Sequence, residues 1–454
     1  MKRRRFLKMT AGSTLAAGAA PLLLGSSSRW IGANDRIRIG VVGIRGMGQS
    51  HIEEFSRLPG VEVAALCDVD ERLFPEIVKK HFADRGRPQP KVFFDLRGLY
   101  DDKEIDAITV VTPNHWHALA GIWAMQAGKH VTIEKPVCHN FFEGRKLVEA
   151  EKKYKVIVQH GMEQRSNPSA QTAVEFMRKG GLGEVYMAKG LCFKWRDTIG
   201  HYEDEPVPDG VHYDLWLGPA PGRPFNRNRF HYNWHWNWDY GNGDIGNQGV
   251  HEIDVARWGL GVTLPTRVSA AGGHFMFKDD QQTPNMLMAT FEFDSPEGGA
   301  DRKKILQFEV RGWITNREAG IGEGKGDAAG GYMVSDENTI GNLFYGSKGY
   351  MAKDVNAWKT FLGRKLDAGP SGKGQGNHYQ DFVNAIRANN QALANGDILE
   401  GHYSAALVHL ANISFRLGRS LKFDPENERF VGDDEANAML RRDYRSPFIV
   451  PDRP

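Results

Sequence analysis

The chain has 454 residues and a formal net charge of +2, and 41% of its residues are hydrophobic. This length suits two domains, and the composition is typical of a soluble globular protein and excludes one built mainly of membrane spans. The three cysteines, Cys67, Cys138 and Cys192, are widely spaced and form no Cys-x-x-Cys motif, so neither a disulfide framework nor a thiolate metal site is expected.

The first 33 residues resemble a twin-arginine (Tat) signal peptide. Arg3-Arg4-Arg5-Phe6-Leu7-Lys8 has two arginines, a variable residue and Phe-Leu-Lys, and an apolar run (9–24) and small residues (25–28) follow. The run is short and broken by Pro21, so no stable membrane span is expected. We expect the Tat export machinery as a partner and a periplasmic or other extracytoplasmic location. A basic, disordered N-terminus is the alternative.

Removal of this segment takes away six basic residues and no acidic one. The formal net charge of the mature chain therefore changes from +2 to −4. A negative balance of this kind argues against nucleic acid as a partner.

The next segment predicts a nucleotide-binding loop. A short β-branched strand (37–42) leads into Gly43-Ile44-Arg45-Gly46-Met47-Gly48, and a helical stretch (50–58) follows. Glycines let the backbone approach a pyrophosphate, and a helix N-terminus offers free N–H groups to negative charge. The glycine order is GxxGxG instead of the commoner GxGxxG, so the motif depends on its strand and helix for support.

A second strand (61–67) ends at Asp68, which lies 20 positions after Gly48. An acidic residue at this point can accept a hydrogen bond from an adenosine ribose hydroxyl, which favours NAD over NADP. Arg45 or Arg72 could partly offset the repulsion of a 2′-phosphate. The alternative for Asp68 is a solvated carboxylate in a turn.

Further strands (105–111 and 129–133) alternate with a helix (118–127), which predicts a parallel, doubly wound sheet. Ligands bind such sheets beyond the carboxyl ends of the strands. Asp68, Thr112 and Lys135 all fall at such ends.

Three segments together resemble the Gfo/Idh/MocA oxidoreductases, a family that includes glucose–fructose oxidoreductase, inositol dehydrogenases and NAD-dependent glycoside hydrolases. They are the glycine loop, Thr112-Pro113-Asn114-His115-Trp116-His117, and Gly128-Lys129-His130-Val131-Thr132-Ile133-Glu134-Lys135-Pro136. The resemblance covers nearly the whole mature chain. It implies that Lys135 reaches both the nicotinamide and the reacting hydroxyl. The expected cofactor-binding residues are Gly43, Arg45, Gly46, Met47, Gly48, Asp68, Thr112, Pro113, Asn114, His117, Glu134 and Lys135.

The second half predicts a large, mainly antiparallel sheet from alternating segments at 185–194, 267–271, 286–293 and 305–311. We therefore expect an α/β chain: a signal peptide (1–33), an NAD(P)-binding Rossmann domain (35–158) and a C-terminal substrate-binding and oligomerisation domain (159–454). The resemblance implies a homo-oligomer, a dimer or a tetramer, formed through the open face of that sheet. Glycine-rich stretches at 320–331 and 369–376 predict mobile loops, and 378–388 and 402–418 predict packing helices.

The segment from Gly243 to Trp258 carries the expected proton chemistry. A single helix would put Asn247, His251, Asp254 and Trp258 on one face. The resemblance makes His251 the general base, and Asn247 stands where many relatives have aspartate, which puts the basicity of His251 in doubt. Lys135, His251 and Asn247 are the expected catalytic residues, and Asp254 could share the proton transfer. A buried structural role is the alternative for His251.

Upstream, the segment 231–240 packs aromatic rings and polar donors into ten residues. Aromatic faces stack on sugar rings while amides bind hydroxyls, which predicts a carbohydrate pocket; a packing loop is the alternative. The expected substrate residues are Arg165, Tyr213, Trp234, Trp236, Asn247 and His251. The histidines lack the fixed spacing of a metal site, so no metal is expected; a zinc site at His115/His117 or His231/His235 is the weaker alternative.

Three functions remain open at this stage. The first is an NAD(P)-dependent oxidoreductase that acts on a sugar or polyol with a tightly retained NAD, since an exported enzyme cannot readily replace its cofactor. The second is an NAD-dependent glycoside hydrolase that uses transient oxidation, elimination, hydration and re-reduction. The third is a catalytically silent carbohydrate-binding member of the family.

Overall fold

The computed structural model describes residues 36–295, 302–321 and 338–454. The expected signal peptide (1–33) and the greater part of the glycine-rich stretch 320–331 lie outside the described residues. No helix of the described ranges is both long enough and apolar enough to cross a membrane.

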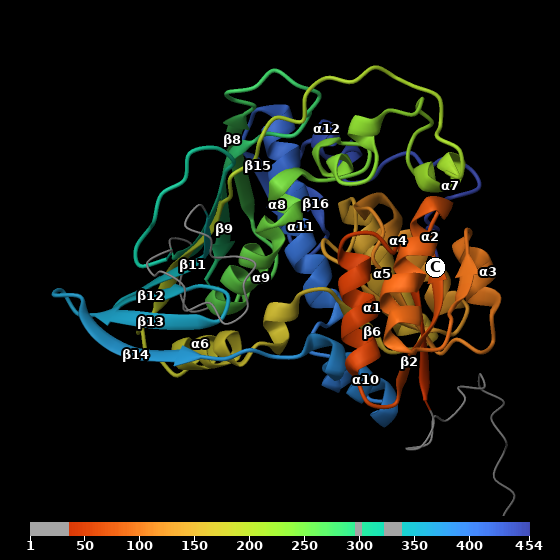
Figure 1. Cartoon of the computed structure of the whole chain (residues 1–454). Coiled ribbons are helices and arrows are strands. Elements are labelled where there is room, and N and C mark those ends of the chain that lie inside the picture. Colours follow the sequence, from red (N-terminus) through yellow and green to blue (C-terminus); the bar gives the residue numbers. More distant parts are fainter. Residues whose placement is uncertain (1–35, 296–301, 322–337) are drawn as a thin grey trace, which may run out of the picture. The chain divides into compact units, whose positions relative to one another are not determined.

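The first half forms a six-stranded parallel sheet (Figure 1). Its strands stand in the order β3-β2-β1-β4-β5-β6, and β4 is buried along its whole length. Such burial on both faces explains the nearly continuous apolar runs of these strands. The strands are β1 (Ile37–Val42), β2 (Val61–Cys67), β3 (Lys91–Phe93), β4 (Ala107–Val110), β5 (His130–Ile133) and β6 (Val158–His160). The helices of this half are α1 (Met47–Arg57), α2 (Phe74–His81), α3 (Leu96–Asp101), α4 (Asn114–Gln126) and α5 (Phe141–Tyr154).

The second half forms a ten-stranded sheet in the order β14-β13-β12-β11-β7-β10-β9-β8-β15-β16. Its paired strands are antiparallel except for β7 and β10, where Met187 lies opposite Ile305 in a parallel pair. The expected fold class, a Rossmann sheet followed by a mainly antiparallel sheet, is therefore confirmed. The strands are β7 (Val185–Phe193), β8 (Arg267–Gly273), β9 (Met286–Asp294), β10 (Lys303–Arg311), β11 (Thr339–Gly346), β12 (Gly349–Lys353), β13 (Ala357–Leu362), β14 (Asp367–Lys373), β15 (Leu421–Asp424) and β16 (Arg429–Phe430).

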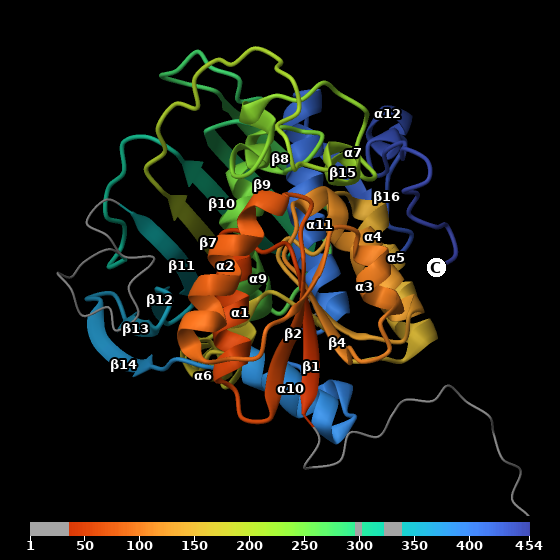
Figure 2. The same ribbon diagram turned by 45° about the vertical axis from the view of Figure 1, so that its right-hand side comes forward.

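Helices of the second half join the two sheets. The long helix α11 packs against α5 of the first half on one side and against β8 on the other (Figure 2). Phe382 and Ile386 of α10 enter the core formed around β1 and α1. The predicted domain boundary at 158 falls inside β6, so the two halves share structure there. These helices are α6 (Pro168–Arg178), α7 (Tyr213–Leu217), α8 (Gly243–Asn247), α9 (Gly249–Leu260), α10 (His378–Ala388), α11 (Ile398–Leu417) and α12 (Asp434–Ala438).

A long segment after β7 crosses to the edge of the first sheet (Figure 1). Its backbone is held there at three consecutive points: the N–H of Glu71 donates to the Gly210 carbonyl, Val211 forms a β-bridge with Asp70, and the N–H of His212 donates to the Val69 carbonyl. We call residues 194–212 the crossing segment. It covers the sheet edge at which Asp68 lies.

Two expectations about elements are wrong. The stretch 369–376 is not a loop throughout, because residues up to Lys373 form β14, which pairs with β13. The segment 243–258 is not one helix: α8 ends at Asn247 and α9 begins at Gly249. Asn247 therefore does not share a helix with His251.

Candidate active site

One large cavity lies beyond the carboxyl ends of the first-sheet strands, and we call it the main cavity. One wall comes from the glycine loop and the ends of β2, β4 and β5, and the other from segment 215–247 of the second half. The expected site residues that line it are Gly43, Arg45, Gly46, Met47, Asp68, Thr112, Pro113, Asn114, His117, Glu134, Lys135, Trp234 and Asn247.

The glycine loop can hold a diphosphate close to its backbone. Gly43 has φ +87°, and a Cβ there would lie 2.5 Å from the Val111 carbonyl oxygen, while a Cβ on Gly48 would lie 2.0 Å from the Gly43 oxygen. A Cβ on Gly46 would meet nothing within 4 Å, so this position is open. Helix α1 starts directly after Gly46 with no side-chain cap and no acidic residue in its first turn. The N–H groups of Gly48 and Gln49 donate to the carbonyls of Arg45 and Gly46, so the N–H of Met47 and the positive end of the helix dipole remain available to an anion.

The side chain of Asp68 is held by hydrogen bonds to the glycine loop and to the turn after β2. Its Oδ2 accepts from the N–H of Ile44 at 2.9 Å and its Oδ1 from the N–H of Asp70 at 3.0 Å. Burial raises the pKa of Asp68 to about 6. Arg72 donates to Asp70 from both Nε and Nη2 at 2.7 Å, so its charge is engaged there. An acidic residue fits the ribose diol of NAD, while Arg45, which lines the same cavity and forms no ion pair with a described residue, is left available to a 2′-phosphate.

Two further groups support the middle of the cavity. The hydroxyl of Thr112 is buried and has no partner among the described residues, so it is available to a polar ligand. The ring of His117 lies between two carbonyls, with Nδ1 2.6 Å from Pro136 O and Nε2 2.7 Å from Thr112 O. A neutral ring donates to one of them at a time. His117 thus ties the end of β4 to the turn after β5.

Lys135 stands at the junction of the two halves. Its Nζ donates to the carbonyl oxygen of Asn247 at 2.7 Å, so helix α8 holds the ammonium at the cavity wall. Behind it, Glu134 accepts from the N–H of Lys135 and pairs with Nε2 of His51 at 2.9 Å. Burial alone would raise the pKa of Glu134, but the bond to His51 holds it well below its usual range. The carboxylate therefore stays charged beside the lysine.

The side chain of Asn247 contacts an acid and not an imidazole. Its Nδ2 donates to Oδ1 of Asp244 at 3.2 Å. The same carboxylate forms a two-point ion pair with Arg196, at 3.0 Å from Nε and 2.7 Å from Nη2. Asn247 thus anchors the end of α8 and does not orient His251.

His251 lies in α9, is 6% exposed and is not among the residues that line the main cavity. Burial lowers its pKa, with the charges of Glu163 and Lys135 acting in opposite directions. No described residue forms a hydrogen bond with its ring. A neutral imidazole near Lys135 can accept a proton.

Asp254 and Arg165 are locked together in the interior. Arg165 donates to both carboxylate oxygens of Asp254, at 2.7 and 2.8 Å, and its guanidinium lies 4.7 Å from the ring of Trp258. Although burial alone would raise the pKa of Asp254, the charge of Arg165 holds it well below its usual range. Neither residue lines the main cavity, so the expected sharing of proton transfer by Asp254 finds no geometric support.

Tyr213 and Trp236 are also not brought to the main cavity. Tyr213 is buried against Trp216 and Phe225, and its hydroxyl donates to the Pro224 carbonyl. Trp236 is 4% exposed, packs beneath the guanidinium of Arg196 and lines a second, neighbouring cavity. For these two rings the packing alternative describes the geometry better than direct contact with a substrate beside Lys135.

Several wall residues were not expected from the sequence. Phe230 and His231 lie on the side of Asp68, where His231 Nε2 is 3.3 Å from Asp70. His235 lies on the other side: its Nδ1 donates to the Tyr232 carbonyl at 2.5 Å, which leaves Nε2 without a proton in the neutral ring. Burial lowers the pKa of His235 to about 3. The spacing of residues in segment 231–240 predicts a sugar pocket and gives no sign that His231 lies on the side of Asp68.

A Rossmann sheet with a glycine loop, a ribose acid and a lysine facing a second domain defines a nucleotide-dependent oxidoreductase architecture. Residues 37–162 match the family model described as "Oxidoreductase family, NAD-binding Rossmann fold". Residues 181–276 and 332–450 match "Oxidoreductase family, C-terminal alpha/beta domain". These matches cover most of the chain, which therefore belongs to the Gfo/Idh/MocA family.

Curated relatives match only part of the chain. A "Glycosyl hydrolase family 109 protein" of Shewanella sp. strain W3-18-1 is 37% identical over 107 residues, 23% of this chain and 23% of the relative. "Glycosyl hydrolase family 109 protein 1" of Shewanella sp. strain MR-4 is 30% identical over 166 residues, 32% of this chain and 36% of the relative. The matched segment thus spans about a quarter to a third of these relatives.

Solved structures resemble the chain over most of its length. Levoglucosan dehydrogenase in complex with NADH and levoglucosan has a TM-score of 0.62 at 17% identity and covers 86% of this chain and 99% of that one. The WlbA dehydrogenase of Bordetella pertussis with NADH and UDP-GlcNAcA has a TM-score of 0.60 at 18% identity, covering 86% and 98%. At these identities the likeness establishes the fold alone.

Proposed function

We propose that this protein oxidises a hydroxyl group of a sugar or polyol with NAD as the hydride acceptor. The observation that carries the proposal is the position of Lys135, held at 2.7 Å from the Asn247 carbonyl in the same cavity as the glycine loop and Asp68. A charged donor at the meeting point of the two halves can bind the oxygen of a substrate hydroxyl. Names of the solved relatives, which include sugar dehydrogenases bound to NADH, support this assignment.

Different residues of the chain would bind the cofactor, stabilise the substrate oxygen and accept the proton. The N-terminus of α1 and the open position at Gly46 would hold the diphosphate, and Asp68 would accept from the ribose. When bound, the cofactor supplies the acceptor for the hydride. Lys135 stabilises the negative charge that develops on the substrate oxygen. A neutral histidine, His251 in our proposal, accepts the hydroxyl proton because its lowered pKa leaves the ring uncharged at neutral pH.

We also propose that the protein is exported by the Tat machinery and keeps its NAD tightly bound. An enzyme outside the cytoplasm has no nicotinamide pool, so a second substrate would have to return the hydride in place. The crossing segment supports retention, since three backbone contacts hold it against the loop that follows Asp68.

We also propose that the protein forms a homo-oligomer. The strand register places Met288 on the same face of the second sheet as Ile305, and the side chain of Met288 is 51% exposed. The same register places Thr290, Glu292 and Gln307 on this face, so it offers a second copy both apolar and polar contacts. Light scattering of the purified protein would give the mass of the assembly, and a monomer would contradict this part.

A glycoside hydrolase is the second candidate, because the curated relatives carry that name. In that reaction, oxidation of a ring hydroxyl acidifies the neighbouring C–H, the aglycone leaves by elimination, water adds to the double bond, and the hydride returns to the sugar. No net redox change results. The same Lys135 and the same neutral histidine would serve both reactions.

One experiment separates these candidates. The protein is purified, its bound nucleotide is released and identified, and free sugars and aryl glycosides are screened while nicotinamide absorbance and aglycone release are both followed. Lasting NADH formation with a free sugar supports the dehydrogenase. Aglycone release without net NADH, abolished in Lys135→Ala, would identify the hydrolase. Ligand binding without turnover in the wild-type protein would instead point to a silent carbohydrate-binding member.

A further inference from the structure

A second cavity lies directly beside the main one, and we call it the side cavity. The short helical turn Asn233–Trp236 runs between the two, and Tyr232 lines both. The side cavity is otherwise formed by residues that the proposed reaction does not use. Those that carry the argument are Trp195, Arg196, Asp197, Tyr202 and Asn233.

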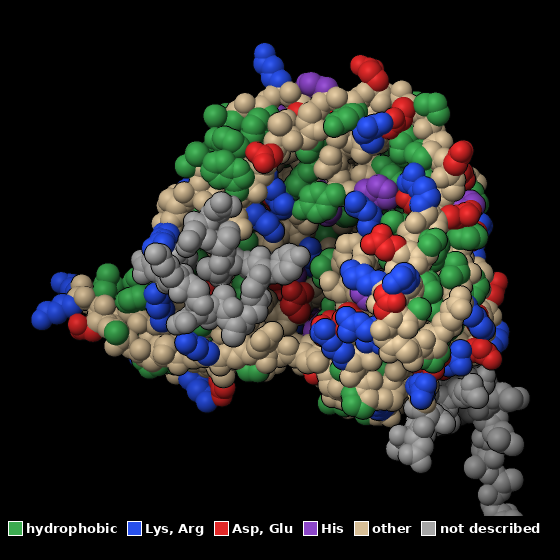
Figure 3. Space-filling model, viewed as in Figure 1, with side chains coloured by type: hydrophobic (Ala, Val, Ile, Leu, Met, Phe, Trp, Pro, Cys, Tyr) green, Lys and Arg blue, Asp and Glu red, His purple; other side chains and the backbone are tan. Residues whose placement is uncertain are grey.

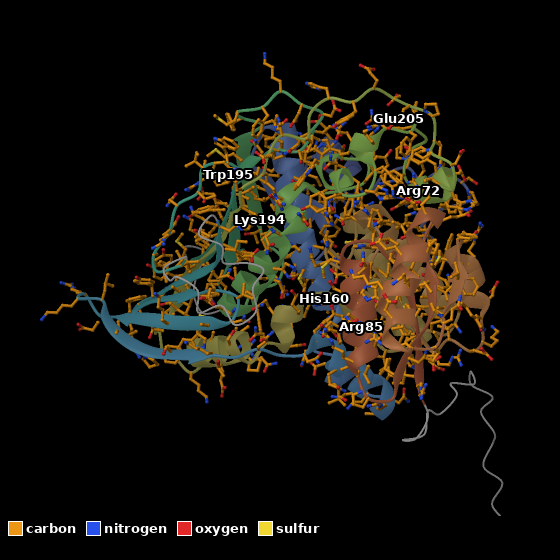
Figure 4. The ribbon with its side chains drawn as sticks, viewed as in Figure 1. Arg72, Arg85, His160, Lys194, Trp195 and Glu205 are labelled. Atoms are coloured by element: carbon orange, nitrogen blue, oxygen red, sulfur yellow. The ribbon has the colours of Figure 1, made fainter. Side chains whose placement is uncertain are left out.

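Three aromatic rings of the side cavity are open to solvent. Trp195, Tyr202 and Tyr232 are 39%, 46% and 47% exposed, which is unusual for rings of this size. Trp195 is held in position by Trp313, whose ring centroid is 4.4 Å away. Figure 4 places Trp195 on the side of the second sheet, and Figure 3, in the same view, shows hydrophobic side chains gathered there beside a hollow in the surface. A fixed, exposed indole offers a flat apolar face at little entropic cost.

Polar groups beside these rings are left free for a ligand. Asp197 forms no hydrogen bond or ion pair with any residue that the structure describes, and neither does the side-chain oxygen of Asn233. Arg196 is held by Asp244 and donates from Nη1 to the Tyr232 hydroxyl at 2.9 Å. Flat aromatic faces combined with free acceptors match the C–H faces and hydroxyl groups of a sugar ring.

A continuous chain of contacts links the two cavities. Lys135 binds the backbone of Asn247, the side chain of Asn247 binds Asp244, and Asp244 binds Arg196 in the side cavity. Only Tyr232 and the turn that follows it separate the two spaces. The two spaces are therefore adjacent, and Tyr232 belongs to the wall of both.

We propose that the side cavity binds a second sugar ring, so that the substrate is an oligosaccharide or glycoside whose reacting ring lies at Lys135. This inference rests on the proposed function, since it assigns the first ring to the main cavity. Trp195 supplies the stacking face for the second ring, and Asp197 accepts hydrogen bonds from its hydroxyls.

Binding measurements test the inference without turnover. A glycan array first identifies disaccharides that bind the purified protein. Calorimetry then measures the affinity for each of these disaccharides and for the methyl glycoside of its non-reducing sugar. Lactose, cellobiose and diacetylchitobiose are measured by calorimetry whatever the array shows. We expect at least one disaccharide to bind about tenfold more tightly than its methyl glycoside. Trp195→Ala should remove this difference and leave the methyl glycoside unaffected, and Asp197→Asn should reduce it. The matched control is Tyr186→Ala, an aromatic residue of β7 that is 50% exposed and lines neither cavity.

The outcomes separate this inference from the proposed function. Equal binding of disaccharide and methyl glycoside, no binding of any glycan, or an equal loss of both ligands in Trp195→Ala with the melting temperature unchanged would overturn the side cavity as a sugar site. Trp195-dependent disaccharide binding in a protein that oxidises no sugar would keep the site and remove the proposed activity.

Discussion

At the residue scale, Asp68 couples proton binding to nucleotide binding. Burial raises its pKa to about 6, so the carboxylate is charged above that pH and increasingly protonated below it. A charged acceptor makes stronger hydrogen bonds to ribose hydroxyls than a neutral one, by about 1 kcal/mol. We expect the affinity for NAD to fall about fivefold as the pH drops through 6.

Calorimetry at a series of pH values checks this dependence. Asp68→Asn should bind NAD more weakly at neutral pH, show a flat profile and discriminate less against NADP. Asp95→Asn is the control, because Asp95 lines the same cavity while its bonds to Arg97, against the effect of burial, lower its pKa. An unchanged profile in Asp68→Asn would remove Asp68 from ribose recognition.

The proton acceptor can be identified from the acid limb of the pH profile, the pH range in which kcat/KM falls as the acceptor becomes protonated. Burial lowers the pKa of His251 below its usual 6.5, so kcat/KM should fall only when the pH drops below that value. In His251→Gln the limb should disappear and kcat should drop about a hundredfold or more. His235→Gln is the comparison, since His235 lines the cavity and its pKa is about 3. A limb that survives in His251→Gln and is lost in His235→Gln would transfer the role to His235.

Position at a strand end was enough to predict that Asp68 and Lys135 lie at one edge of the sheet, because parallel strands direct their carboxyl ends to that edge. Arg165 could not be placed in this way. Its partners, Asp254 and Glu400, are distant in sequence, so only the folded chain shows that the guanidinium is neutralised inside the protein. Tyr213 illustrates the same limit, since an aromatic residue fits a core as well as a sugar site.

At the element scale, the crossing segment should control release of the nucleotide. His212 binds Glu71 at 2.7 Å, and its ring stacks on Phe94, which lines the main cavity, at 5.2 Å. Removal of these two contacts in His212→Ala should accelerate dissociation of NAD about tenfold, because one hydrogen bond and one ring contact are lost. Stopped-flow fluorescence measures the rate. His201→Ala is the control, since His201 belongs to the same segment but binds Asp280. Equal rates in both variants would show that the segment does not hold the cofactor.

Helices and strands were predicted correctly where hydrophobic residues repeat at a regular spacing. The prediction failed where contacts with distant parts of the chain decide the structure. β14 carries Gly369 and Gly372, which predict a loop, yet its backbone pairs with β13. Tertiary pairing overrides weak local preference in such strands. The break between α8 and α9 was missed for a related reason: Asn247 is held by Asp244 and Lys135, and these contacts end α8 there.

At the scale of the whole molecule, the two halves share one structure. Helix α11 contacts both, β6 crosses the predicted boundary, and the second half supplies part of the wall of the main cavity. An NAD site built from both halves cannot form before the chain has folded. The export that we propose for an NAD-loaded enzyme would therefore require a pathway that carries folded proteins, such as the Tat machinery.

This requirement predicts what happens when the signal is damaged. In the double variant Arg3→Lys and Arg4→Lys, we expect the protein to remain in the cytoplasm as a folded precursor that contains NAD. Arg5→Lys, which changes only the variable position of the motif, should be exported as the wild type is. Fractionation followed by nucleotide analysis of each pool measures both properties. If the exported wild-type protein contained no nucleotide while the retained precursor did, the cofactor would be lost in transit, and the proposed retention would fail even though export by this route would stand.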